Sequence, residues 1–113
     1  MSLPQLPNYL RSNRKRLALS QGEVAFLLGV HSGAKVCRYE RFTCEPSLET
    51  ALAFEVIFQR SASELFGGLY QKVEREVAAR AKMLAERTIG RKPNQRTVLK
   101  RQALANIADK YLN

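Results

Sequence analysis

Residues 20–40, SQGEVAFLLGVHSGAKVCRYE, carry the signals of two short helices joined by a tight turn. Ser20 is followed three positions later by Glu23, a spacing that lets the hydroxyl and the carboxylate cap the start of a helix reciprocally. Gly29 stands where a left-handed residue ends such a helix. The pattern predicts a first helix that begins near Gln21 and stops at Gly29, with a second helix close behind it.

The apolar positions of the two helices are few and closely spaced. In the first helix, Val24 and Ala25 belong to one buried stripe. In the second, which Ser32 is predicted to cap, Val36 and Tyr39 lie three positions apart and share a face. Two short helices packed in this way form the unit with which many proteins place a helix in the major groove of DNA.

Several further motifs follow one another in a set order between residues 9 and 66. They are Arg14, SQ at 20–21 with Ala25, LGV at 28–30, VCRYE at 36–40, PSLET at 46–50 and SASELF at 61–66. In this order they resemble the Cro/repressor-like (XRE-type) helix-turn-helix family of transcriptional regulators. The resemblance implies an all-α fold, with a five-helix lambda-repressor-like DNA-binding domain followed by a C-terminal helical extension.

The resemblance also implies which residues meet the DNA. The helix over residues 32–41 would lie in the major groove, and Gln21 would touch the DNA at the start of the preceding helix. A structural ion pair is implied between Arg14 and Glu40. The predicted DNA-binding residues are Gln21, Ser32, Gly33, Ala34, Lys35, Cys37, Arg38 and Arg41.

The turn and the reading helix depart from the family pattern. Ala25 and Glu40 are fifteen positions apart, one more than in the family, so we expect an extra residue around His31 to Gly33. Gly33 and Ala34 replace the longer polar residues that often read bases. The sequence therefore predicts a reading surface with few long side chains, on which Lys35 and Arg38 are the donors available to guanine edges or phosphates.

Other start and stop signals divide the chain. Asn8 is expected to cap a first helix over residues 9–17. After Pro46, a fourth helix is expected to bury Leu48, Leu52 and either Val56 or Ile57, and residues 62–66 are expected to form a short fifth helix. The predicted DNA-binding domain spans residues 1–68.

The extension, residues 69–113, is predicted to contain two helices. The first is expected to follow the pair Gly67 and Gly68 and to run to about Thr88 before Gly90 and Pro93 break it. Its apolar stripe comprises Leu69, Val73, Val77, Ala81 and Leu84. The second is expected over residues 97–112, with Leu99, Ala103 and Ile107 on one side. This extension is the predicted dimerisation region of a homodimer, or the surface for another protein partner.

The positive charge is concentrated in the extension. Counting Lys and Arg against Asp and Glu gives 8 − 6 = +2 for residues 1–68 and 11 − 4 = +7 for residues 69–113, which together make the net +9. A basic excess favours polyanionic partners through counterion release. The alternative is a solvated helix face that makes no contact with nucleic acid.

The residue types needed for catalysis or metal binding are scarce. His31 is the only histidine and Asp109 the only aspartate, and no glycine-rich phosphate loop is present. Two cysteines, Cys37 and Cys44, make neither a disulfide framework nor a four-ligand zinc set. We therefore expect no enzyme activity, no cofactor and no metal. The small polar character of Cys37 favours a residue that faces the groove over a thiol sensor.

The chain of 113 residues lacks an apolar run near the roughly 20 residues that a membrane helix needs, and it shows no signal peptide. We expect a cytoplasmic protein with no membrane contact. The predicted function is sequence-specific binding of double-stranded DNA as a transcriptional regulator. Two alternatives stay open: an antitoxin-like or other protein-interaction component that uses the C-terminal helices, and nonspecific nucleic-acid packaging by the basic extension.

Overall fold

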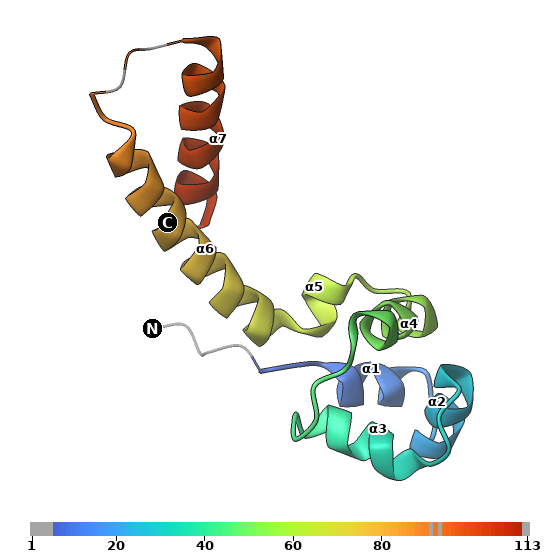
Figure 1. The fold of residues 1–113 in the computed structure, drawn as a ribbon. Helices are drawn as coiled ribbons and strands as arrows, with labels where there is room; N and C mark the ends of the chain where they lie inside the picture. The colour runs from blue at the N-terminus through green and yellow to red at the C-terminus, as the bar shows by residue number, and fades with distance from the viewer. Residues whose placement is uncertain (1–5, 91, 93, 112–113) are drawn as a thin grey trace. The chain divides into compact units, whose positions relative to one another are not determined.

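The computed structural model describes residues 6–90, 92 and 94–111. Within these residues the fold is all-α, with seven helices and no strand (Figure 1). The helices are α1 (Leu10–Arg16), α2 (Gln21–Leu28), α3 (Gly33–Glu40), α4 (Leu48–Phe58), α5 (Ala62–Leu65), α6 (Gly67–Arg87) and α7 (Gln95–Tyr111). The chain forms two compact units, Met1–Tyr70 and Gln71–Asn113, called here the N-terminal and the C-terminal unit.

The predicted start and stop of α2 are both confirmed. Ser20 Oγ accepts a hydrogen bond from the backbone N–H of Glu23 at 3.0 Å, and Glu23 Oε1 accepts one from the backbone N–H of Ser20 at 2.8 Å. Hydrogen bonds from the backbone N–H and from the side chain of Ser20 lower the pKa of the Glu23 carboxyl. Gly29 ends the helix with a φ of +77°, in the left-handed region that glycine adopts without steric cost.

The predicted side-chain cap of α3 is wrong. Ser32 occupies the N-cap position, but its side chain makes no capping hydrogen bond. The serines that do cap helices, Ser20, Ser47 and Ser61, have φ values of −80°, −65° and −64°. Ser32 has a φ of −153°, a more extended backbone than the three capping serines share.

Asn8 caps α1 from one residue before the N-cap position. Its Oδ1 accepts from the backbone N–H of Leu10 at 3.1 Å. Its Nδ2 donates to the carbonyl of Tyr39 at 3.0 Å, which lies at the far end of α3. The buried amide thus satisfies one free donor of α1 and fixes α1 to α3 at the same time.

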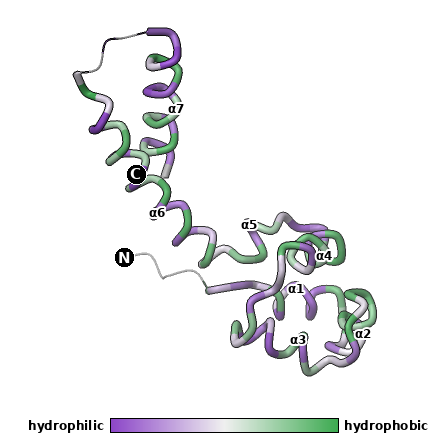
Figure 2. Tube along the Cα trace, in the orientation of Figure 1, coloured by the Kyte–Doolittle hydropathy of each residue, from purple (hydrophilic) through white to green (hydrophobic). Residues whose placement is uncertain are grey.

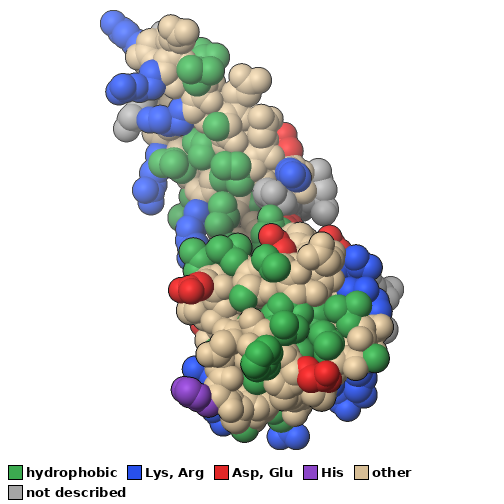
Figure 3. Space-filling view, turned by 90° about the vertical axis from the view of Figure 1, so that its right-hand side faces the viewer, with side chains coloured by type: hydrophobic (Ala, Val, Ile, Leu, Met, Phe, Trp, Pro, Cys, Tyr) green, Lys and Arg blue, Asp and Glu red, His purple; other side chains and the backbone are tan. Residues whose placement is uncertain are grey.

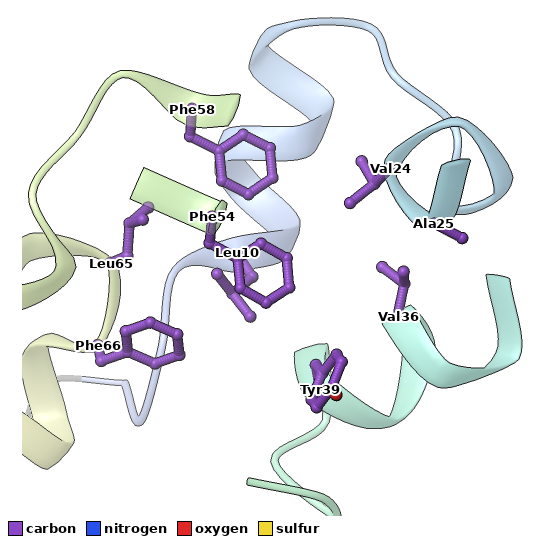
Figure 4. Close-up of a cluster of buried hydrophobic side chains, with 9 residues drawn as sticks. All are labelled: Leu10, Val24, Ala25, Val36, Tyr39, Phe54, Phe58, Leu65 and Phe66. Carbon is purple, nitrogen blue, oxygen red and sulfur yellow. The ribbon is translucent and has the colours of Figure 1, made fainter. Parts of the chain in front are cut away.

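The core of the N-terminal unit combines side chains from α1 to α5 and the residue that follows α5 (Figure 4). Phe54 lies at its centre, with ring centroids 5.8 Å from Tyr39, 5.9 Å from Phe58 and 6.3 Å from Phe66. Such aromatic pairs add stabilisation beyond the area they bury. The buried members are Leu10, Val24, Ala25, Val36, Tyr39, Phe54, Phe58, Leu65 and Phe66.

The predicted buried stripe of α4 is largely wrong. Leu48 is 77% exposed, Leu52 49% and Val56 68%, whereas Phe54 and Phe58 are buried. Ile57, the predicted alternative to Val56, packs partly buried against the core. The helix is apolar on both faces, so periodicity alone does not choose between them. Each phenylalanine is larger than a leucine or valine, and both phenylalanines join the aromatic cluster, which favours the observed orientation.

The predicted start of α6 after the glycine pair is wrong, although α5 and α6 are separate helices as predicted. Gly67 and Gly68 form the first turn of α6. There the backbone N–H groups have no partner within the helix, and the N–H of Gly68 donates instead to the carbonyl of Leu6 at 2.8 Å. Leu69 packs against the core of the N-terminal unit.

In the C-terminal unit, α7 returns along the later part of α6 (Figure 1). The buried residues of α6 in this unit are the small Ala78 and Ala81, and Leu104 is buried in α7. Arg101 Nη2 donates to the carbonyl of Thr88 at 2.8 Å and ties the two segments together.

The predicted stripes of the extension are therefore largely wrong. Val73, Val77 and Leu84 remain 45%, 43% and 44% exposed, and Leu99 on the predicted side of α7 is 59% exposed. Ala81, which the predicted stripe included, is buried, and so is Ala78, which the stripe omitted. Gly90, predicted to break the helix, lies three residues after the end of α6 and has a φ of +88°. Pro93, the other predicted breaker, lies outside the described residues.

No helix in the described part of the chain is long and apolar enough to cross a membrane.

Two glycines of the helix pair provide a matched test of how closely α3 approaches α2. A Cβ on Gly33 would lie 3.1 Å from the backbone nitrogen of Gly22, whereas a Cβ on Gly22 would meet nothing closer than Ser20 Oγ at 3.8 Å. Gly33→Ala is expected to lower the free energy of unfolding by about 1 kcal/mol, because backbone atoms must move. Gly22→Ala is expected to raise it by about 0.5 kcal/mol. Urea unfolding followed by circular dichroism measures both, and equal shifts would contradict the close approach.

Candidate nucleic-acid interface

One face of α3 is exposed and basic. Val36 and Tyr39 are buried on one side of the helix. Ala34, Arg38 and Arg41 follow one another at four- and three-residue spacing on the opposite side, and all three are exposed. At about 100° per residue, Arg38 and Arg41 lie near the middle of this outward face, while the exposed Lys35 lies at its edge.

The charges of the N-terminal unit are segregated between helices. Of its eight basic residues, seven lie on α1, on α3 or directly after α3, and Arg60 is the exception. Of its six glutamates, only Glu40 lies on either of those helices. Figure 2 shows the matching contrast in hydropathy, with α2 and α4 mostly hydrophobic. The surface formed by α1 and α3 is therefore basic and nearly free of carboxylates.

A buried ion pair holds α1, α2 and α3 together beneath this surface. Arg14 Nε donates to Glu40 Oε2 at 2.6 Å, with side chains only 12% and 5% exposed. Arg14 Nη2 donates to Glu40 Oε1 at 3.3 Å, and Arg14 Nη1 donates to the carbonyl of Leu19 at 3.1 Å. The Gln21 amide donates to Glu40 Oε1 at 3.1 Å. The hydrogen bond to Glu40 raises the pKa of the Arg14 guanidinium, which keeps Arg14 charged.

A surface hollow of about 490 Å³ opens over this pair. Its lining comprises Arg11, Arg14, Ser20, Gln21, Cys37, Glu40 and Arg41. Arg11 and Arg41 are exposed. Because Glu40 is already paired with Arg14, these two arginines leave the hollow with an excess of positive charge. An anion fits this electrostatic environment.

The structure brings some of the predicted DNA-binding residues to one surface and removes others from it. Ala34, Lys35, Arg38 and Arg41 are exposed on α3 or directly after it. Cys37 is half-buried at the hollow. Gly33 packs against the backbone of α2, so it sets the distance between helices and presents no side chain to a partner.

Sequence reasoning missed Arg11 as a member of the site. Arg11 lies one helical turn before Arg14, a spacing that puts both side chains on the same face of α1. That spacing was the available signal. Ser20, predicted only as a helix cap, also lines the hollow.

The cysteines and the histidine are not gathered into a reactive site. Cys37 and Cys44 are both free thiols. His31 is exposed in the turn between α2 and α3. Among the described residues, no group of three or more His, Cys, Asp or Glu side chains is arranged to hold a metal ion.

We compared the chain with known proteins in three ways. Searches against protein-family models, curated proteins and solved structures found no match for the chain.

The Arg14–Glu40 pair is expected to couple the stability of α1 and α3. Glu40→Ala leaves a buried guanidinium without its partner and is expected to lower the free energy of unfolding by about 3 kcal/mol. In a double-mutant cycle with Arg14→Ala, the second substitution should cost much less than it does alone. The exposed pair Lys72–Glu76, 3.9 Å apart, is the control and should couple by less than about 0.5 kcal/mol. Similar coupling in the two cycles, measured by urea unfolding, would contradict a structural role for Arg14–Glu40.

Proposed function

We propose that the protein binds double-stranded DNA in a sequence-specific manner and acts as a transcriptional regulator, with α3 in the major groove. The observation that carries this proposal is the exposed basic face of α3 on a surface almost free of carboxylates. A helix supplies base readout from a few side chains on one face, and neighbouring positive charge holds the phosphates.

The side chains of α3 divide these two tasks. Arg38, near the middle of the outward face, is placed to address a guanine edge with two parallel hydrogen bonds. Lys35 and Arg41 are placed to contact phosphates on either side of it. The short side chains of Ala34 and Cys37 leave room for the helix to approach the bases closely. Ser32 is exposed in the turn, where its hydroxyl is available to a phosphate.

The hollow over the ion pair is the proposed phosphate site at the start of α2. The free backbone N–H groups at a helix start favour an anion, and the exposed Arg11 and Arg41 add charge there. The hydrogen bond to Glu40 fixes the orientation of the Gln21 amide beside this site. In this proposal Gln21 acts through that fixed geometry.

The arrangement of α1 to α5 supports a five-helix, lambda-repressor-like domain, to which α6 and α7 add the helical extension. We propose that the protein acts without catalysis, as a homodimer assembled through the C-terminal unit. Val73, Val77 and Leu84 are each more than 40% exposed and are available for this contact. Two copies would double the number of bases read.

Arg38→Ala tests which helix reads the DNA. Sites are first selected from a random duplex pool with the unaltered protein, and affinities are then measured by fluorescence anisotropy at fixed salt. Arg38→Ala is expected to weaken binding by about 1–3 kcal/mol and to relax the preference at one base position. Lys35→Ala should weaken all sequences alike, because a phosphate contact carries no base information.

The control for this test is Arg60→Ala, which removes one positive charge from the same unit at a position on neither α1 nor α3. It should leave the selected sequence and its affinity nearly unchanged. If Arg38→Ala, Lys35→Ala and Arg41→Ala all bind as tightly as the unaltered protein, α3 does not contact the DNA.

The dimer predicts the arrangement of the selected sites. A two-fold homodimer should enrich inverted half-sites whose centres lie about 10 bp, one helical turn, apart. Changing that spacing by about 5 bp should abolish tight binding, since the half-sites then face opposite sides of the duplex. Selection of single, unpaired half-sites would contradict the dimer while leaving DNA binding intact.

The exposed stripe of α6 favours a second candidate function, that of an antitoxin-like or other protein-interaction component. Exposed apolar side chains of this kind are typical of protein contacts. Failure of the random pool to yield any enriched sequence, with the protein folded, would favour this candidate over DNA binding.

A further inference from the structure

A second apolar surface lies on the N-terminal unit, on helices that the proposed DNA contact does not use. It is formed by α2 and α4, which pack on each other. Figure 3 looks onto this face, where hydrophobic side chains gather with carboxylates among them. The α2–α4 patch comprises Phe26 (84% exposed), Leu27 (53%), Leu48 (77%), Leu52 (49%) and Val56 (68%).

This exposure has no explanation within the unit. Phe26 and Leu27 border a surface hollow beside Glu23. Val56 borders another, lined by Glu55 and Glu64 and by one basic residue, Arg60. The core is filled by other residues, so burial of the patch must come from elsewhere. Contiguous exposed apolar side chains with a polar rim are typical of protein contacts.

The charge around the patch selects the kind of occupant. Residues 17–34 and 42–59 contain no Lys or Arg, but they contain four glutamates. Glu23 lies three positions before Phe26, and Glu49 lies three before Leu52, so each carboxylate is one helical turn from a patch residue. Two such patches would repel each other, whereas a basic apolar surface would be attracted.

The chain itself supplies a surface of that chemistry. Residues 71–113 contain 11 basic and 4 acidic residues, a net charge of +7. In α6, Val73, Val77 and Leu84 stay exposed in a helix that carries five basic residues and three glutamates. Lys72 is paired with Glu76, and Arg80 and Lys82 are exposed between Val77 and Leu84. Apolar side chains flanked by lysine and arginine complement apolar side chains flanked by glutamate.

We propose that the α2–α4 patch binds the basic C-terminal unit of a second copy of this chain. This inference rests on the homodimer of the proposed function and names the surface that the C-terminal unit contacts. Each copy offers one patch and one basic unit, so a reciprocal exchange closes a two-fold dimer with two equivalent contacts. The apolar side chains supply affinity, and the charges select this pairing over patch against patch.

Sedimentation equilibrium of the full chain without DNA tests the exchange. Leu48→Gln/Val56→Gln should raise the dimer Kd at least about tenfold, and Val73→Gln/Val77→Gln should do the same. The control Leu6→Gln removes a leucine that is 58% exposed in the same unit outside α2 and α4, and it should leave Kd unchanged. Thermal unfolding by circular dichroism verifies that each variant is folded.

Mixing the two double variants separates reciprocal exchange from the other pairings. Each variant alone should be largely monomeric, but an equal mixture should form a heterodimer, because one intact patch then meets one intact basic unit. If the Leu48→Gln/Val56→Gln variant still dimerises, the basic units pair with each other and the proposal fails. If Val73→Gln/Val77→Gln still dimerises, the patches pair and the proposal fails. A full-length chain that stays monomeric at micromolar concentration also overturns it.

Salt provides an independent readout with a defined sign. Raising NaCl from 0.1 M to 1 M shortens the Debye length from about 10 Å to about 3 Å, so attraction between opposite charges should weaken and Kd should rise. Pairing of two acidic patches would show the reverse, because screening relieves their repulsion. These measurements contain no DNA, so loss of DNA binding and loss of the exchange remain distinguishable.

Discussion

The buried contact between Arg14 and Glu40 is the interaction on which the arrangement of α1, α2 and α3 depends. Glu40 accepts from Arg14 and Gln21, and Arg14 also donates to the carbonyl of Leu19, so one pair joins three helices. A buried ion pair adds little net stability compared with apolar packing, because desolvation opposes attraction. Its value here is geometric: it fixes the orientation of α3 relative to the start of α2, and this orientation defines the basic surface.

Local signals in the sequence were sufficient to predict the ends of a helix where a single residue sets the backbone geometry. The capping box of Ser20 and Glu23 and the left-handed Gly29 fixed the limits of α2, since each acts through its own backbone hydrogen bonds or φ. The expected side-chain cap at Ser32 does not form, because such a cap also depends on the backbone of the preceding turn, which holds Ser32 at a φ of −153°. A residue type permits a cap, but the path of the turn decides whether the cap forms.

Periodicity was less informative where a helix is apolar on more than one side. In α4, the stripe of Leu48, Leu52 and Val56 competes with Phe54 and Phe58, and only the tertiary packing around Tyr39 and Phe66 decides between them. In α6 of the C-terminal unit, the large apolar residues that were expected to be buried are exposed, and alanines form the buried face. Prediction of the candidate site was limited in the same way by tertiary packing. The spacing of residues indicated the exposed side of α3. The hollow that includes Arg11 forms only when α1, α2 and α3 pack together, so the sequence did not reveal it.

The two errors in predicting buried stripes have a common physical meaning. The side chains that were expected in the interior, on α4 and on α6, are apolar residues that the folded units leave in contact with water. Each such residue forgoes roughly 25 cal/mol per Å² of exposed apolar area until another surface covers it. The stripe on α4 has glutamates around it, and the stripe on α6 has lysines and arginines. In the proposed exchange, the stripe on α4 of one copy is buried against the stripe on α6 of the other. Both stripes would then carry the sequence pattern of buried helix faces while remaining exposed within their own units.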